Sequence, residues 1–159
     1  MNAPILTDKV YNLWVLLHQT RDAIFKVRDK ELAKHGISPA EAAALFIIQA
    51  TGENVTPIEI SRWMLREPHT VTGLLNRMEK KGLVRRSKDR DRKNLVRVSL
   101  TEKGKQVYNQ STERGSINSA ISALSGPEQQ QLGSYLQKLR DQALKELELQ
   151  YVVPFPPQV

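Results

Sequence analysis

The chain has 159 residues, no cysteine and a formal net charge of +7, with 40% hydrophobic and 26% charged residues. This length suits one domain with one core, and the lack of cysteine excludes a disulfide framework, a cysteine-based zinc site and a thiol redox switch. There is no apolar run of membrane-spanning length and no secretory signal, so we expect a cytoplasmic protein without a membrane partner.

Two helices are predicted in the first third of the chain. The apolar residues of 7–34 follow the 3.6-residue period of an amphipathic helix, and Gly36 stands where a left-handed C-cap is wanted. The sequence Ser38-Pro39-Ala40-Glu41 has the pattern of a capping box with proline at the first helical position. A second helix is therefore expected over 39–50, and its apolar run predicts that it is buried.

A helix-turn-helix is predicted next. Thr56-Pro57-Ile58-Glu59 repeats the capping-box pattern and opens a short helix that runs to about Met64. Pro68 disfavours helix at the residue before it but can itself open a helix, which is expected to continue to about Lys81 and to end at Gly82. Two helices separated by so few residues are typical of a helix-turn-helix.

The pattern then changes from helix to strand. Residues 83–87 and 95–99 alternate in part between apolar and polar side chains and are rich in valine, which predicts two short strands. Residues 88–94 between them contain no apolar side chain and predict a charged hairpin tip.

Helical patterns return after the hairpin. One helix is expected from Thr101 to about Ala123, with Gly115 as its weak point, and an amphipathic helix is expected over 127–150 after a third capping box at 125–128. The predicted fold is mainly α with a small β-hairpin wing, a single domain over 1–159.

The positive charge is concentrated in the middle of the chain. Between Arg62 and Lys105 lie 14 basic and 5 acidic residues, whereas the rest of the chain is slightly acidic. Such a segment is the footprint expected for phosphate binding, although a solvated charged face is the alternative. The histidines lack metal-ligand spacing and no phosphate loop or nucleophile motif is present, so we expect no enzyme, metal or cofactor.

The N-terminal residues of the helix over 68–81 are expected to approach base edges in the major groove of DNA. Its candidate contacts are His69, Thr70, Thr72 and Gly73. Histidine and threonine can exchange hydrogen bonds with bases, and glycine allows close approach to DNA or to a packing neighbour. The alternative is that Thr70 and Thr72 only cap and solvate the turn.

The hairpin tip carries four basic side chains, namely Lys88, Arg90, Arg92 and Lys93. An arginine on a flexible arm can enter the narrow minor groove, where the negative potential is strongest. We expect Asp91 to pair with an arginine and to shape the tip, with Arg77 as a candidate partner. The alternative that Arg77 contacts a phosphate stays open.

These features together closely resemble the MarR family of bacterial and archaeal transcription factors. The resemblance is carried by Thr70-Val71-Thr72, by Glu79-Lys80-Lys81-Gly82-Leu83-Val84, by Asp91-Arg92-Lys93 and by Ser99-Leu100-Thr101-Glu102-Lys103-Gly104, and it extends over about 10–147. It implies a homodimer with a helical dimerisation region over 7–50 and 101–150 and a DNA-binding region over 56–100. Two recognition helices would then meet successive major grooves of a palindromic operator.

The resemblance also places the wing arginine of the family at Lys93. Lysine keeps the charge but lacks the planar fork of arginine, so Arg90 or Arg92 is expected to take the minor-groove role.

Many members of the family release DNA when a small aromatic or phenolic ligand binds between the dimer helices and the winged domain. Four residues near one face of the first helix are candidates for lining that cleft: Tyr11, Trp14, His18 and Arg21. The alternative is that Trp14 belongs to the dimer core and His18 is a satisfied polar group. The sequence thus predicts a ligand-responsive repressor; an architectural or protein-docking winged-helix module is the competing hypothesis.

Overall fold

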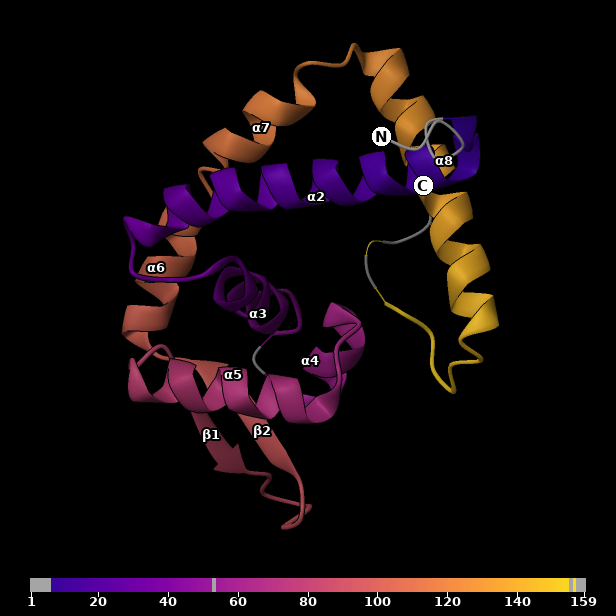
Figure 1. Cartoon of the computed structure of the whole chain (residues 1–159). Helices are drawn as coiled ribbons and strands as arrows, with labels where there is room; N and C mark the ends of the chain where they lie inside the picture. The colour runs from indigo at the N-terminus through magenta and orange to yellow at the C-terminus, as the bar shows by residue number, and fades with distance from the viewer. Residues whose placement is uncertain (1–6, 53, 155, 157–159) are drawn as a thin grey trace.

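The computed structural model of the chain, which describes residues 7–52, 54–154 and 156, is mainly helical and contains one antiparallel β-hairpin (Figure 1). Its elements, in chain order, are α2 (Lys9–Ala33), α3 (Pro39–Ala50), α4 (Pro57–Met64), α5 (Pro68–Lys80), β1 (Val84–Lys88), β2 (Val96–Leu100), α6 (Glu102–Ser111), α7 (Gly115–Ile121) and α8 (Gly126–Glu146). This order agrees with the predicted fold class.

The three predicted capping boxes are present. In each, the serine or threonine side chain accepts a hydrogen bond from the backbone N–H of the glutamate three residues later, and that glutamate accepts one from the backbone N–H of the cap. The pairs are Ser38–Glu41, Thr56–Glu59 and Ser125–Glu128. They satisfy backbone donors that a helix start leaves without a partner. α3 and α4 begin at the predicted residues, and α8 begins at Gly126, one residue before the predicted start, and ends at Glu146 instead of about Gln150.

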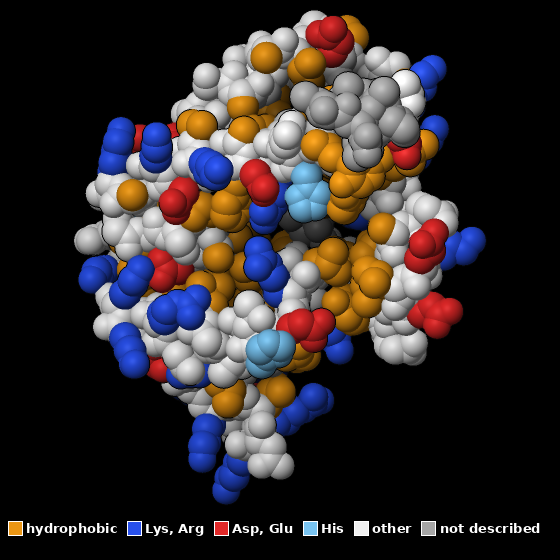
Figure 2. Space-filling model, in the orientation of Figure 1, with side chains coloured by type: hydrophobic (Ala, Val, Ile, Leu, Met, Phe, Trp, Pro, Cys, Tyr) orange, Lys and Arg blue, Asp and Glu red, His pale blue; other side chains and the backbone are white. Residues whose placement is uncertain are grey.

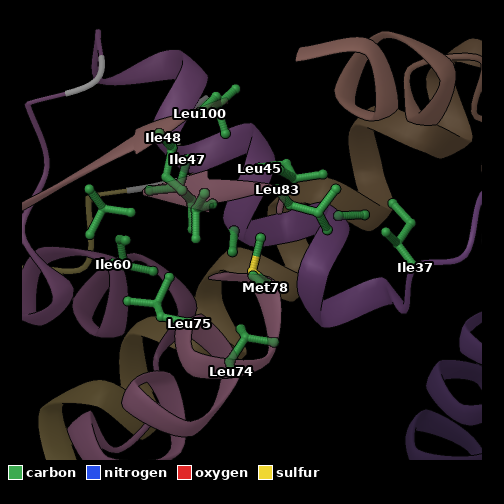
Figure 3. Packing of buried hydrophobic residues seen from close by; sticks show 14 of the residues in the cluster. Ile37, Leu45, Ile47, Ile48, Ile60, Leu74, Leu75, Met78, Leu83 and Leu100 are labelled. Carbon is green, nitrogen blue, oxygen red and sulfur yellow. The ribbon is translucent and has the colours of Figure 1, made fainter. Parts of the chain in front are cut away.

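The hydrophobic core lies among α3, α5 and the hairpin. Leu45 and Ile48 of α3 and Leu75 and Met78 of α5 are completely buried and point toward one another (Figure 3). The hairpin adds Val98, whose backbone N–H donates to the carbonyl of Val55 at 2.9 Å. The core is therefore that of a small winged domain, and it fixes α5 and the hairpin relative to each other.

The segment after the hairpin differs from the prediction. One helix was expected over 101–123, but α6 ends at Ser111 and α7 begins at Gly115, because Arg114 adopts a left-handed conformation with φ of 51°. Glu31 of α2 holds this break, since its carboxylate accepts hydrogen bonds from the backbone N–H (3.0 Å) and the hydroxyl of Ser116. Arg28 completes the junction by donating to the carbonyl of Ser111 at 2.7 Å.

The long helices lie outside the core. In Figure 1, α2 passes over the winged domain with α7 beside it, and α8 crosses the view of the N-terminal end of α2 and runs down past the winged domain. Leu32 is the buried residue of α2, and the described residues of α8 include no buried one. No helix in the described part of the chain combines the length and apolarity that a membrane crossing needs.

Candidate nucleic-acid interface

The turn between α4 and α5 sets the angle of the helix-turn-helix. Leu65 adopts a left-handed conformation with φ of 50°, its N–H bonds to the carbonyl of Arg62, and the N–H of Arg66 bonds to the carbonyl of Ser61 at 2.9 Å. This pair of hydrogen bonds is that of a Schellman motif, which stops α4 sharply. Pro68 then begins α5 at a position where no backbone donor is needed.

One face of α5 is buried and the other is open to solvent. The buried side consists of Val71, Leu74, Leu75 and Met78. The predicted DNA-contacting residues of this helix lie on the other side: His69, Thr70, Thr72 and Arg77 are exposed, and Gly73 is half-buried. The Thr72 hydroxyl donates to the carbonyl of Pro68 at 3.0 Å, so its oxygen can still accept a hydrogen bond on this exposed side chain. A duplex lying along this face of α5 could therefore reach all of these residues.

The hairpin projects from the domain beyond α5 (Figure 1). Its strands pair from Val84 opposite Leu100 to Lys88 opposite Val96. Within the described part of the chain, Arg90, Arg92 and Lys93 are exposed and form no ion pair, and Figure 2 shows Lys and Arg side chains flanking the projecting hairpin. Positive charge is thus available at the tip.

The predicted pairing of Asp91 with Arg77 is wrong. The carboxylate that organises the tip is that of Asp89, which forms an ion pair with Arg97 at 2.8 Å and accepts hydrogen bonds from two backbone N–H groups of the tip. These hydrogen bonds lower the pKa of Asp89 to about 2, and the one from the Arg97 side chain has the largest effect. Arg77 stays exposed, which leaves its side chain available for a phosphate.

A second contact, not foreseen from the sequence, joins the wing to α5. The Arg86 guanidinium of β1 donates to the Glu79 carboxylate at 2.6 and 3.1 Å and to the Asn76 side chain at 2.6 Å. The hydrogen bond from the Arg86 side chain is the main cause that lowers the pKa of Glu79. No local sequence signal marks this contact, because it depends on how the hairpin packs on the helix.

The four predicted ligand residues form a row along α2. Tyr11 and Trp14 are 52% and 54% exposed, and the Trp14 ring meets the His18 ring edge-on at 4.6 Å between centroids. The Arg21 guanidinium lies over the Phe25 ring and bonds to Asp22. Figure 2 shows a hollow below the position that α2 has in Figure 1, with hydrophobic side chains beside it.

A different cavity, of about 510 Å³, lies between the second half of α8 and the segment that follows. Its lining includes Arg140, Leu144 and Tyr151, and the four predicted ligand residues do not line it.

Comparisons with known proteins agree with this geometry. The model of the MarR family matches residues 35–93, which include the helix-turn-helix and the tip of the hairpin. An uncharacterized HTH-type transcriptional regulator, YfiV of Bacillus subtilis (strain 168), is 28% identical over 132 residues, which are 82% of each chain.

Two solved structures are also informative. The organohalide-sensing transcriptional regulator RdhR, in its 2,4-dichlorophenol-bound form, is 28% identical with a TM-score of 0.89, over 99% of this chain and 96% of that one. A mutant MarR from E. coli complexed with operator DNA has a TM-score of 0.77 at 23% identity, over 84% of this chain and 97% of that one, and this likeness shows the fold.

Proposed function

This chain belongs to the MarR family of winged helix-turn-helix transcriptional regulators, which bind DNA, and we propose that it represses transcription as a homodimer on a palindromic operator. A small phenolic ligand releases it from that operator. The proposal assigns base reading to the first turn of α5 and backbone and minor-groove contacts to the wing.

The arrangement of α5 and the wing carries this proposal. The N-terminal part of α5 presents His69, Thr70 and Thr72 to solvent while the opposite face of the helix is held in the core. A protein-docking surface would more often present an aromatic or aliphatic anchor at this place. The tip at 88–94 projects beyond α5 (Figure 1) and carries four basic side chains, so we infer that helix and wing meet adjacent grooves of one duplex.

Variants of the two parts should behave differently. Replacing Arg92 and Lys93 with alanine removes cations from the wing, so binding should weaken on all sequences and the slope of log K against log salt should fall by about 1 for each phosphate that the wing no longer neutralises. Replacing His69 with alanine should cost about 1–3 kcal/mol on the preferred site and relax the preference at one base position. Titration of labelled operator at several salt concentrations measures both.

Competition supplies the control for sequence preference. Random duplex DNA should displace the protein from its operator only at a large excess, because specific sites bind typically 10³–10⁷ times more tightly than random DNA. Equal competition by random and operator DNA would instead identify an architectural binder, and identical behaviour of the wing and helix variants would contradict the division of labour.

The ligand proposal rests on a relative and on the row of residues along α2. RdhR, at 28% identity over nearly all of this chain, is described in a 2,4-dichlorophenol-bound form. In this chain Trp14 and Tyr11 offer aromatic surface, and His18 and Arg21 offer polar groups for a phenolic oxygen. An exposed aromatic row with a few polar groups suits a small aromatic ligand once a second wall closes the cleft.

A thermal-shift series with 2,4-dichlorophenol and related phenols tests the ligand. A ligand at 100 times its Kd stabilises the folded state by about 2.7 kcal/mol, and the shift should disappear in Trp14→Ala. Val27→Ala is the matched control, because Val27 is exposed on α2 but lies away from the row. A phenol that shifts neither the wild-type midpoint nor its operator affinity would exclude that phenol, and failure of the whole series would overturn the ligand proposal.

A further inference from the structure

The tip of the wing carries two carboxylates among its four basic side chains, and one of them, that of Asp89, is largely buried. Asp89 keeps only 18% of its side chain exposed, and both of its oxygens are used. Oδ1 accepts hydrogen bonds from the backbone N–H groups of Asp91 and Arg92, each at 2.9 Å, and Oδ2 accepts one from Nε of Arg97 at 2.8 Å. Asp89 therefore fixes the backbone of the residues that carry the exposed arginines.

Arg97 connects this tip to the body of the domain. From β2 its Nη1 donates to the carbonyl of Asn54 at 2.6 Å, in the segment between α3 and α4. The tip is also closed by its own backbone, since the N–H of Asp89 bonds to the carbonyl of Leu95 and the N–H of Leu95 bonds to the carbonyl of Arg92, both at 2.8 Å. The course of 89–92 is thus fixed relative to the helix-turn-helix as well as to the hairpin.

The neighbouring Asp91 is used differently. Its side chain is exposed, and in the described part of the structure its carboxylate forms no ion pair and accepts no hydrogen bond. Asp89 and Asp91 therefore contribute the same charge to the same tip, two residues apart, while only Asp89 holds other groups. This contrast separates the effect of the charge from the effect of the hydrogen bonds.

We propose that Asp89 and Arg97 are positioning residues for DNA binding, which hold the backbone of Arg90 and Arg92 in the conformation that enters the minor groove. The inference rests on the proposed function, in which the wing contacts DNA. A free carboxylate near phosphates repels the duplex, so by charge alone Asp89 is unfavourable. Asp89 nevertheless favours binding, because a tip that is already ordered in the free protein loses less conformational entropy when it binds the operator.

Removal of each aspartate tests this directly. If charge alone mattered, Asp89→Ala and Asp91→Ala would both tighten operator binding, because each removes one negative charge from the tip. Positioning predicts opposite signs: Asp91→Ala should bind at least as tightly as wild type, whereas Asp89→Ala should bind about tenfold or more weakly, as expected when the tip is no longer ordered before binding. Hydroxyl-radical footprints should lose the protection of the minor groove in Asp89→Ala and keep the protection made by α5.

Arg97→Gln provides the second variant, because it breaks the same ion pair from the other side and leaves Asp89 in place. If the two residues act as one unit, the double variant Asp89→Ala with Arg97→Gln should bind little worse than either single variant. Additive losses would show that Arg97 contacts DNA itself and would overturn its positioning role. Thermal melts of each variant identify a loss of affinity that comes only from unfolding, which would also count against positioning.

The outcomes separate the two proposals. A wild-type protein without a footprint on any palindrome contradicts the proposed function. A wild-type footprint together with equal affinities for the Asp89 and Asp91 variants leaves the function standing and overturns this inference.

Discussion

At the scale of single residues, Gly73 is the position where folding and DNA binding make opposite demands. A Cβ built there would meet only Nη1 of Arg77, at 3.7 Å, which is ordinary contact. No packing neighbour in the described chain therefore requires glycine at this place, although glycine in a helix costs about 1 kcal/mol relative to alanine. Close approach to DNA therefore remains as the reason for a glycine at this position.

Gly73→Ala should accordingly raise the free energy of unfolding, by up to about 1 kcal/mol from helix propensity, and should weaken operator binding. Urea denaturation and operator titration of the same preparation measure the two effects. Unchanged affinity would mean that the duplex does not come close to this part of α5.

Gly104 of α6 provides the contrasting control. A Cβ there would lie 2.0 Å from the carbonyl oxygen of Leu83, which is backbone and cannot move aside without shifting the start of the hairpin. Gly104→Ala should therefore destabilise the fold, by roughly 1–3 kcal/mol as for other overpacked sites. If Gly73→Ala and Gly104→Ala changed the free energy of unfolding in the same direction, the space available for a Cβ would not explain the difference between the two positions.

At the scale of elements, local signals predicted the helix starts well. A capping box is complete within four residues, so Ser38, Thr56 and Ser125 identify their helices without knowledge of the rest of the chain. The valine-rich strands around a charged tip were equally local, and the structure places each strand within one residue of its predicted bounds.

The features that could not be predicted depend on distant parts of the chain. The break between α6 and α7 is held by Glu31, which lies 85 residues before Ser116, and no pattern over 101–123 reveals it. The choice between Asp89 and Asp91 is similar, because it depends on the hairpin register that brings Arg97 opposite the tip and on the position of Asn54. The expectation that an aspartate pairs with an arginine and shapes the tip is confirmed, but the residues are Asp89 and Arg97 instead of Asp91 and Arg77.

The junction of α2 with α7 should make stability depend on pH. The Ser116 hydroxyl is the main cause that lowers the pKa of Glu31 to about 2, with Arg28 and the Ser116 N–H contributing. Because this pKa lies below the ordinary value of 4.5, the hydrogen bonds of ionised Glu31 stabilise the fold above about pH 4.5, and that contribution disappears as the pH falls toward 2.

Glu31→Gln should therefore be less stable than wild type at pH 7, and the difference should shrink as the pH falls through this window. Chemical denaturation between pH 7 and pH 3 measures it. Glu113→Gln, in the exposed turn of the same junction, is the matched control and should follow the wild-type curve. A difference between Glu31→Gln and wild type that stays constant with pH would contradict the role assigned to the Glu31 carboxylate.

At the scale of the whole molecule, apolar surface remains on the two long helices. Leu13 and Leu16 of α2 are 62% and 57% exposed, and Tyr135 and Leu139 of α8 are 53% and 54% exposed. The described part of α8 buries no residue, although its apolar positions follow one face. Monomeric proteins rarely leave such contiguous apolar faces in water, so we expect a second copy of the chain to cover them.

Leu136→Asp tests this expectation, because it puts a charge in the middle of the apolar face of α8. Sedimentation at micromolar concentration should find a dimer for wild type and a monomer for the variant. Ser134→Asp introduces the same charge on the opposite face of α8, by the helical period of about 100° per residue, and should remain dimeric. The affinity for operator DNA should change in parallel with the oligomeric state, because only a dimer can contact two half-sites about 34 Å apart. Leu136→Asp should thus lose affinity for the full palindrome but bind a single half-site as tightly as wild type does. A wild-type protein that is monomeric in solution and still protects both half-sites would contradict the expected dimer.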